Sequence, residues 1–286
     1  MYESFFGLAE PPFSLSPDAR FLWLSDTHDE GLAALRYGIT SRKGFVLLTG
    51  EVGAGKTTLL RAAFARLPVN TEVVLLTNTE AMSALDLLKY VAAHLALGGR
   101  PRTRADYVIA LHTFLLSRLD VGWNTVLVID EAQNLNLTTL EQVRLLSNLE
   151  TERAKLLQIV LAGQPELRQK LADPKLRPLR QRIAIEHHVD ALRPEDVLPY
   201  LSHRIQVAGG RFEDVFEPGV EAAFQAFAAG VPRLLNVLAD QALLAAFARG
   251  QRPASRLLVE SKARELAAAR AVPPWKDEEG EVAHDG

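Results

Sequence analysis

Short apolar runs alternate with amphipathic stretches from the N-terminal region to about residue 191. Apolar runs bounded by turn residues are typical of buried strands, and apolar positions repeating every three or four residues are typical of helices. The runs that predict strands are 45–48, 72–76, 125–129, 156–161 and 183–189. The stretches that predict helices between them are 56–67, 81–97, 104–119 and 138–150. This alternation predicts an α/β domain with a mostly parallel sheet.

The pattern changes after Leu192. Residues 193–196 place proline and acidic residues where a helix begins, and the chain from there to about Arg270 is rich in alanine and leucine without a strand pattern. We therefore expect a small all-helical domain there. The predicted segments are an N-terminal arm (1–40), an α/β core (41–191), a helical lid domain (192–270) and a disordered acidic tail (271–286).

Composition limits the class of protein. Hydrophobic residues make up 48% and charged residues 23% of the chain, which suits a globular protein with a sizeable core. The absence of cysteine excludes disulfides, thiolate metal sites and cysteine nucleophiles, and fits a reducing compartment. Apolar runs fall short of the roughly 18 residues that span a bilayer, and residues 1–4 do not resemble a secretory signal. We expect a cytoplasmic protein without direct membrane insertion, which reaches the inner membrane only through a partner.

The formal net charge is −3, but the charge is uneven. From Lys276 onward one lysine stands against five acidic residues, which leaves the rest of the chain at about +1. A nearly neutral body does not favour strong binding to nucleic acid, although a local basic patch would still allow it.

The segment Gly50-Glu51-Val52-Gly53-Ala54-Gly55-Lys56-Thr57 matches the phosphate-binding pattern G-x-x-x-x-G-K-[ST]. Backbone N–H groups of such a loop converge on triphosphate oxygens, and glycines allow an approach that a Cβ would block. The helix expected from Lys56 points its positive end at the same anion. Lys56 is predicted to reach the β- and γ-phosphates of ATP, and the Thr57 hydroxyl to hold Mg²⁺. Thr58 completes the predicted nucleotide-binding set. A chance match in a glycine-rich turn is the alternative, but the apolar strand before the loop and the helix after it favour a phosphate site.

Two adjacent carboxylates, Asp130 and Glu131, end the third predicted strand. Ligands of open α/β sheets bind at the carboxyl ends of strands. Asp130 fits a second anchor for Mg²⁺, usually through water, and Glu131 fits a catalytic role in polarising an attacking water. The alternative is an acidic turn that ends the strand.

Gln164 follows the fourth predicted strand and precedes Pro165. Its side chain either contacts the γ-phosphate or the attacking water, or is simply the polar residue that begins a helix. The sequence leaves both interpretations open.

Three arginines, Arg177, Arg180 and Arg182, precede the fifth predicted strand. In oligomeric ATPases an arginine in this place completes the site of the neighbouring subunit and stabilises charge in the transition state. We favour Arg180 and then Arg182, with a solvated basic turn as the alternative. Arg233 begins a helix after Pro232 and is predicted to contact bound nucleotide, unless it is an ordinary surface residue.

Together these segments resemble one ATPase family. The resemblance rests on Phe5-Phe6-Gly7-Leu8, Pro12-Phe13-Ser14-Leu15-Ser16-Pro17-Asp18, Phe21-Leu22-Trp23-Leu24-Ser25 with His28, the loop 50–58, Asp130-Glu131-Ala132-Gln133-Asn134-Leu135 and Gly230-Val231-Pro232-Arg233-Leu234-Leu235-Asn236. Over about residues 1–265 the chain resembles AAA+ ATPases of the general secretion pathway protein A (ExeA-like) family. Transposition ATPases of the TniB/TnsC kind share much of this core. The resemblance implies a P-loop fold with a five-stranded parallel sheet in the order 5-1-4-3-2.

The resemblance also places the N-terminal arm beside the adenine, with His28, Tyr37 and Gly38 as the residues nearest to it. The alternative for the aromatic residues of the arm is that they are packing anchors. Relatives often continue into a membrane-spanning helix and a peptidoglycan-binding domain, and the sequence from residue 1 to 286 leads us to expect neither. We therefore expect an ATPase core that acts with a separate membrane partner.

The leading hypothesis is Mg²⁺-dependent ATP binding and hydrolysis by a homo-oligomer, either a ring or a filament. It would act as a motor or switch in assembling a secretion, pilus or exopolysaccharide export system. One alternative is a DNA-binding ATPase that regulates transposition, which the near-neutral charge disfavours. Another is a scaffold that binds nucleotide and scarcely hydrolyses it, which Glu131 disfavours.

Overall fold

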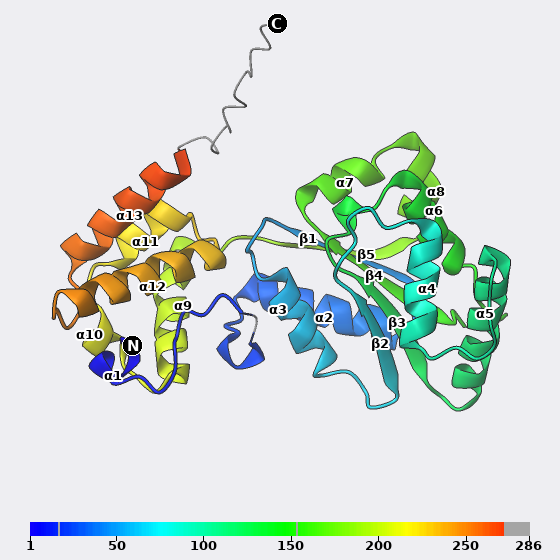
Figure 1. The fold of residues 1–286 in the computed structure, drawn as a ribbon, viewed down its shortest axis with the longest axis horizontal. Helices are drawn as coiled ribbons and strands as arrows, with labels where there is room; N and C mark the ends of the chain where they lie inside the picture. The colour runs from blue at the N-terminus through cyan, green and yellow to red at the C-terminus, as the bar shows by residue number, and fades with distance from the viewer. Residues whose placement is uncertain (17, 153, 272–286) are drawn as a thin grey trace, which may run out of the picture. The chain divides into compact units, whose positions relative to one another are not determined.

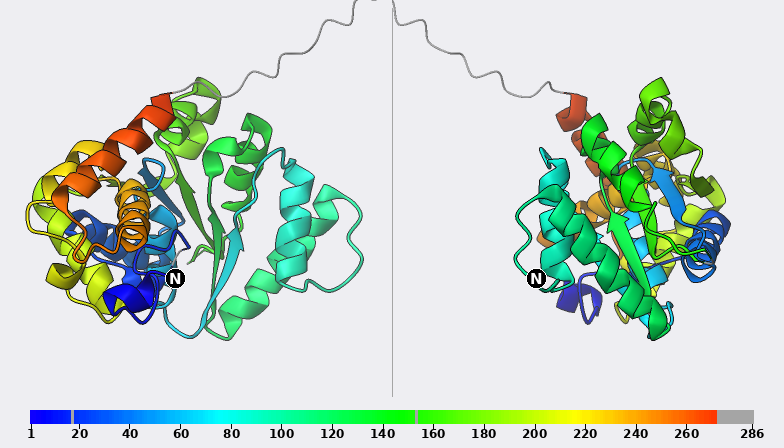
Figure 2. Two further views of the ribbon diagram at one scale, coloured as in Figure 1. Left: turned by 60° about the vertical axis from the view of Figure 1, so that its left-hand side comes forward. Right: turned by 90° about the vertical axis from the view of Figure 1, so that its right-hand side faces the viewer.

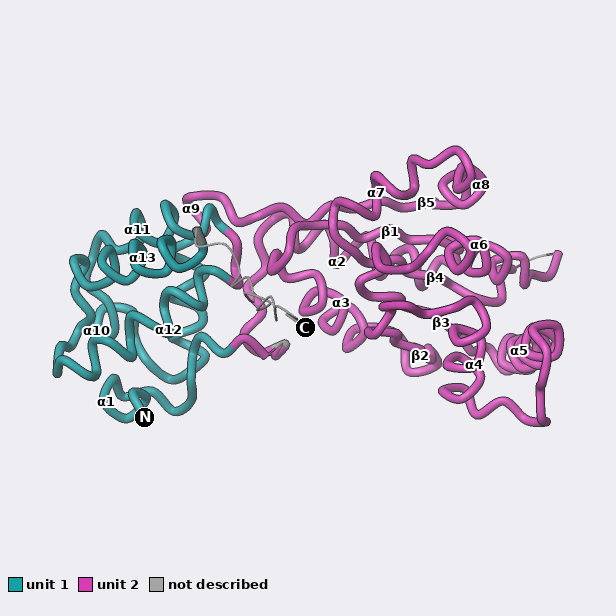
Figure 3. The backbone as a smooth tube through the Cα atoms, turned by 45° about the horizontal axis from the view of Figure 1, so that its top comes forward, with its two compact units in different colours: residues 1–14, 197–230, 234–286 teal, residues 15–196, 231–233 magenta. Residues whose placement is uncertain are grey.

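The computed structural model describes residues 1–16, 18–152 and 154–271. Contacts between residues divide the chain into two compact units (Figure 3). Among the described residues, the larger unit consists of residues 15–196 and 231–233, and the helical unit consists of residues 1–14, 197–230 and 234–271. The predicted acidic tail lies outside the described residues, apart from its first residue. The other segment boundaries stay predictions.

The larger unit contains a five-stranded parallel sheet (Figure 1). Its strands are β1 (Phe45–Gly50), β2 (Thr71–Leu76), β3 (Asn124–Ile129), β4 (Leu157–Gly163) and β5 (Ile183–Val189). Their order is β2-β3-β4-β1-β5, and each neighbouring pair is parallel. From the other edge this is 5-1-4-3-2, so the α/β class and the expected order are confirmed. Because β4 lies between β1 and β3, the segments that follow these three strands meet at one edge of the sheet.

Side chains that alternate along the strands form two cores, one on each face of the sheet. Val46 and Leu48 of β1 face a core formed with α2 (Asp26–Thr40) and α3 (Lys56–Phe64). Phe45 and Leu47 face the opposite core. The helices on that side are α4 (Ala84–His94), α5 (Arg104–Asp120), α6 (Leu137–Leu146), α7 (Pro165–Leu171) and α8 (Arg177–Arg180). Figure 2 shows the two helical layers with the sheet between them.

Several helices of the larger unit are preceded by a capping residue whose side chain accepts a hydrogen bond from a backbone N–H of the first turn. Ser25, Ser83, Thr103 and Asn136 do so for α2, α4, α5 and α6, respectively. Each such cap contributes about 1 kcal/mol to stability. Short 3₁₀ helices, η1 (Ala19–Phe21), η2 (Ala132–Asn134) and η3 (Pro174–Leu176), complete the unit. The caps fix where each helix begins, and so fix the turns that precede it.

The helical unit contains α1 (Glu3–Phe6), α10 (Phe212–Val215), α11 (Glu221–Ala228) and α13 (Arg256–Ala271), with most of α9 (Pro194–Val207) and α12 (Pro232–Ala248). The helical character predicted after residue 192 is therefore confirmed. The N-terminal residues are tied into this unit. Arg204 Nε donates to the carbonyl oxygen of Pro12 at 2.6 Å, and Arg252 Nη1 donates to that of Phe5 at 2.7 Å.

The aromatic residues of the N-terminal arm pack as anchors. Phe6 and Phe13 are fully buried, and the ring of Phe5 lies 5.6 Å from that of Phe247, edge to face. Such pairs contribute about 1 kcal/mol beyond their buried area. In the described part of the chain, none of the helices has both the length and the apolar character that a membrane crossing requires.

Candidate active site

At two positions, the loop between β1 and α3 has a backbone conformation that only glycine adopts easily. Gly53 has φ +82° and Gly55 has φ +101°. An added Cβ at Gly53 would lie 2.5 Å from Cβ of Arg233, so space as well as conformation requires glycine there. α3 begins directly afterwards at Lys56. The loop therefore presents backbone N–H groups and a helix N-terminus to one point, as an anion site requires.

Lys56 is buried beneath this loop. Its Nζ donates to the carbonyl oxygens of Gly50, at 2.8 Å, and of Glu51, at 2.9 Å. Burial lowers the pKa of Lys56, and the carboxylates of Glu131 and Asp130 oppose that shift. The Lys56 side chain thus reaches back from the start of α3 to the first two residues of the loop, at the place where phosphate charge would be neutralised.

Thr57 and Asp130 are in direct contact at the same edge of the sheet. Oγ1 of Thr57 donates to Oδ2 of Asp130 at 2.8 Å, and the backbone N–H of Glu131 donates to Oδ1 at 3.0 Å. Asp130 is buried. A hydroxyl and a carboxylate oxygen side by side, next to a phosphate loop, are the hard donors that suit Mg²⁺, which takes its remaining ligands from phosphate and water. The residues present therefore fit the metal, and Thr57 and Asp130 would hold it.

Glu131 follows with a left-handed backbone, at φ +53°. This conformation is uncommon for a residue with a long side chain, and such strain clusters at functional sites. Nε2 of Gln164 donates to Oε2 of Glu131 at 3.3 Å, and Nε2 of Gln133 donates to the same oxygen. The hydroxyl of Thr79 donates to the Glu131 carbonyl oxygen at 2.9 Å. Gln164 is the residue before α7, yet its side chain does not cap that helix, so it is available for the carboxylate.

His28 lies against the loop backbone. Its Nε2 is 3.2 Å from the carbonyl oxygen of Ala54, and its Nδ1 is 2.6 Å from Oγ of Ser25. Burial lowers the pKa of His28. For a neutral ring, the consistent assignment is Nε2–H donating to Ala54 and Nδ1 accepting from Ser25. His28 thus supports the loop, and its predicted place beside the adenine stays a prediction.

The other two residues expected near the adenine differ in surroundings. Tyr37 is 54% exposed, with Nζ of Lys43 5.3 Å from its ring centre. Gly38 is buried, and a Cβ there would lie 2.4 Å from Cγ2 of Val46, so it allows α2 to pack closely on β1. Of the pair, Tyr37 has the face that a base could reach.

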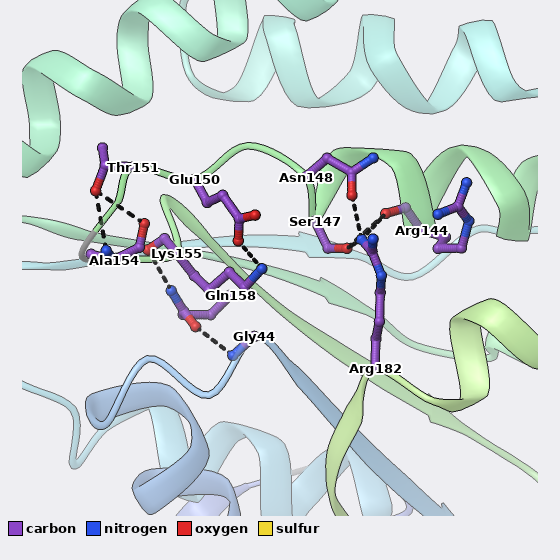
Figure 4. A network of polar contacts seen from close by, with 10 residues as sticks. All are labelled: Gly44, Arg144, Ser147, Asn148, Glu150, Thr151, Ala154, Lys155, Gln158 and Arg182. Atoms are coloured by element: carbon purple, nitrogen blue, oxygen red, sulfur yellow. Dashed lines mark hydrogen bonds and ion pairs between the residues drawn. The ribbon is translucent and has the colours of Figure 1, made fainter.

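The three candidate arginines before β5 are in different positions. Arg182 donates to the carbonyl oxygen of Arg144, at 3.3 Å, and to Oγ of Ser147 and Oδ1 of Asn148, both at 2.5 Å (Figure 4). The Arg182 guanidinium group therefore supplies hydrogen-bond donors to acceptors at the C-terminal end of α6 in its own chain. Arg177 and Arg180 lie on α8 with exposed side chains, and neither side chain has a hydrogen bond or ion pair within the described residues.

Arg233 belongs to the unit that contains the phosphate loop. Its backbone N–H donates to the carbonyl oxygen of Gly53 at 3.2 Å, while its side chain is exposed. The backbone contact places Arg233 beside the loop, and its guanidinium group has no hydrogen bond or ion pair within the described residues.

Two residues of the site were missed by sequence reasoning. Gln133 and Thr79 both contact Glu131, although neither was assigned a role from the sequence. The sequence signals for Gln133 are its place two residues after Glu131 and its membership of the segment 130–135 that carries the family resemblance. Thr79 has no signal, because its role depends on the end of β2 lying beside the end of β3.

Comparisons with known proteins relate this chain to a domain family and to a curated protein. A family model described as an AAA domain matches residues 39–171. The chain is 42% identical over 277 residues to General secretion pathway protein A of Aeromonas hydrophila, a match that covers 96% of this chain and 50% of that protein. The chain thus spans about half the length of this curated relative.

Solved structures with the same fold are more distant in sequence. The ORC2 protein of Aeropyrum pernix, solved with ADPNP and ADP, has a TM-score of 0.69 at 17% identity, covering 92% of this chain and 75% of its own. CDC6P of Pyrobaculum aerophilum has a TM-score of 0.71 at 17% identity, and the match covers 92% of this chain and 74% of CDC6P. The RuvB Holliday junction branch migration motor of Thermotoga maritima has a TM-score of 0.58 at 18% identity, and the match covers 85% of this chain and 70% of RuvB. Residues 39–171 therefore match an AAA domain, the chain is similar over 96% of its length to General secretion pathway protein A, and its fold is that of these solved structures.

Proposed function

We propose that this protein binds ATP with Mg²⁺ and hydrolyses it. The observation that carries this proposal is the contact between Thr57 and Asp130, with Glu131 as the next residue. The loop and Lys56 would bind the phosphates, Thr57 and Asp130 would hold the metal, and Glu131 would polarise the attacking water. Mg²⁺ supplies charge neutralisation on the phosphates when it is bound. Gln164 would align the carboxylate of Glu131 or the water.

We propose further that the active form is a homo-oligomer, because Arg180 is exposed and unpaired within the described residues. A guanidinium group on the surface can enter the site of a neighbouring copy and stabilise transition-state charge. Arg233 would act within the chain, where its backbone already contacts Gly53. Whether the oligomer is a ring or a filament depends on the geometry between copies.

The cellular role that we propose is assembly of a secretion system, on the basis of the name of the relative at 42% identity. The matched part is half of that protein, so the client of the ATPase is proposed and not transferred. Assembly of pili or an exopolysaccharide exporter would use the same switch. Attachment to the inner membrane would then come from a partner, with the protein itself in the cytoplasm.

Phosphate release with and without Mg²⁺ tests the proposed activity. Lys56→Ala should lose ATP binding and turnover, whereas Glu131→Gln should retain binding and lose turnover by about 100-fold or more. Lys43→Ala, an exposed lysine outside the loop, is the matched control and should retain both. Full turnover in Lys56→Ala would refute the assignment, and full turnover in Glu131→Gln would remove Glu131 from the reaction.

One surface feature favours a second candidate, DNA-dependent ATP hydrolysis. Arg100, Arg102 and Arg104 are all exposed, in and directly after the loop that joins α4 to α5. Clustered arginines neutralise phosphates and make affinity fall steeply with salt. Replacing all three with glutamine should abolish any salt-sensitive duplex binding, measured by fluorescence anisotropy. If wild-type protein binds no duplex at low salt with ATP present, this candidate is excluded.

A further inference from the structure

We infer that Gln133 is a positioning residue that holds the carboxylate of Glu131 in place for the reaction. This inference rests on the proposed hydrolysis, in which Glu131 polarises water. Gln133 and Gln164 both donate to Oε2 of Glu131. Within the described residues Oε1 of Glu131 has no partner, so this oxygen is left to accept a proton from water. Two donors on one oxygen fix the rotation of the carboxylate about its last bond.

The orientation of the Gln133 amide is itself determined. Its Oε1 accepts a hydrogen bond of 3.0 Å from the backbone N–H of Gln164. Because a backbone N–H can only donate, the atom facing it must be the oxygen, which leaves Nε2 to face Glu131. Gln133 therefore links the segment after β3 to the segment after β4.

Gly163, the last residue of β4, provides the space for this link. A Cβ added there would lie 2.6 Å from Oε1 of Gln133, closer than a Cβ is normally found to another atom. Since the φ of Gly163 is not in the left-handed region, its conformation does not require glycine. The proximity of Gln133 is therefore one physical reason for the missing side chain.

The turn that carries Gln133 is anchored from α7. Nζ of Lys170 donates to the carbonyl oxygens of Gln133 and Leu135, the latter at 2.9 Å, so it fastens η2 at two points. Thr79 holds the carbonyl oxygen of Glu131 on the other side. A left-handed residue such as Glu131 persists only where its surroundings fix it. Gln133 completes this support by fixing the side chain as Lys170 and Thr79 fix the backbone.

The test compares Gln133→Glu with wild type. The variant keeps the shape of the side chain and the acceptor for Gln164, but it replaces the donor that faces Glu131 with a second carboxylate oxygen. Loss of alignment by about 1 Å costs about 100-fold in rate. We expect kcat to fall by about that factor, with the ATP concentration at half-maximal rate unchanged within about threefold. Gln133→Ala should likewise lower kcat and leave the ATP concentration at half-maximal rate unchanged. Gln169→Glu, an exposed position on α7, is the matched control and should behave as wild type.

A second measurement does not depend on turnover. Gln133→Ala, Glu131→Ala and the double variant are unfolded with urea in the absence of nucleotide. If the two side chains are coupled, the shift in midpoint for the double variant is smaller than the sum of the single shifts. Additive shifts would overturn the inference, and so would full kcat in both Gln133 variants. A wild-type protein without ATPase activity would refute the proposed hydrolysis instead, and the role inferred for Gln133 in the reaction would fall with it.

Discussion

The hydroxyl of Thr57 donates a hydrogen bond of 2.8 Å to the carboxylate of Asp130. The two residues are far apart in the chain, and they meet because the segments after β1 and β3 end at the same edge of the sheet. Glu131 comes next in sequence but turns away through its left-handed backbone. The two adjacent carboxylates therefore have different partners, since Asp130 accepts from the Thr57 hydroxyl and Glu131 accepts from two glutamine amides. This difference is the basis for assigning different roles to them.

Replacement of Thr57 by valine removes the hydroxyl and keeps the shape of the side chain. Because the hydroxyl is a predicted Mg²⁺ ligand, we expect the Mg²⁺ concentration for half-maximal ATPase activity to rise by about 10- to 100-fold. Thr57→Ser retains the hydroxyl and should stay within about threefold of wild type. Titration of Mg²⁺ at saturating ATP measures the difference. Identical titrations for the two variants would show that the hydroxyl does not bind the metal.

The crowding at Gly53 predicts a measurable difference between two glycines. Gly53 and Gly99 both have positive φ, at +82° and +88°, but only Gly53 has neighbouring atoms where a Cβ would lie. Alanine at either position costs about 1–2 kcal/mol in backbone strain. Gly53→Ala should cost more than Gly99→Ala in urea unfolding, because it also displaces Arg233. It should weaken ATP binding as well, measured by calorimetry, and Gly99→Ala should not. Equal effects of the two variants would contradict the close approach of Arg233.

Burial of His28 predicts a dependence of stability on pH. Its pKa is lowered in the folded protein, so below the ordinary value of about 6.5 the unfolded chain binds the proton more readily. The contribution of neutral His28 is fully present above about pH 6.5 and decreases as the pH falls toward its lowered pKa. Unfolding by urea at a series of pH values should show that the free energy of unfolding decreases less steeply with falling pH in His28→Gln than in wild type. His94→Gln, at an exposed position, should keep the wild-type slope. The same slope in all three proteins would mean that His28 takes up its proton while folded.

The sheet and the main site residues could be predicted from the sequence because their signals are local. Each strand is an apolar run with its own turn residues, and the phosphate loop and the acidic pair are contiguous segments. The structure brings Lys56, Thr57, Asp130 and Glu131 together as those segments implied. The order of the strands followed from the family resemblance, since periodicity carries no information about which strands are neighbours.

The remaining features depend on contacts between distant segments. Gln133 contacts Glu131 and Gln164 only because β3 and β4 end side by side. The packing of the first fourteen residues with the helical unit has no local pattern either. Arg180 and Arg182 could not be distinguished by sequence, because the directions of two side chains two positions apart are known only once the end of α8 is known.

Because Arg182 is bonded within its own chain and the Arg180 side chain is exposed, loss of each arginine should have a different effect. Arg182 makes three hydrogen bonds to the end of α6, so Arg182→Ala should lower the free energy of unfolding by about 1–3 kcal/mol. Arg180→Ala should leave the free energy of unfolding unchanged and lower ATPase activity in the oligomer by about 1000-fold. Mixing Arg180→Ala with Lys56→Ala subunits should restore part of the activity, because a wild-type arginine then faces an intact phosphate loop at some interfaces. Arg177→Ala, at an exposed position on the same helix, is the control for loss of charge. No recovery on mixing would contradict action between subunits, and a stable but inactive Arg182→Ala would transfer the role to that residue.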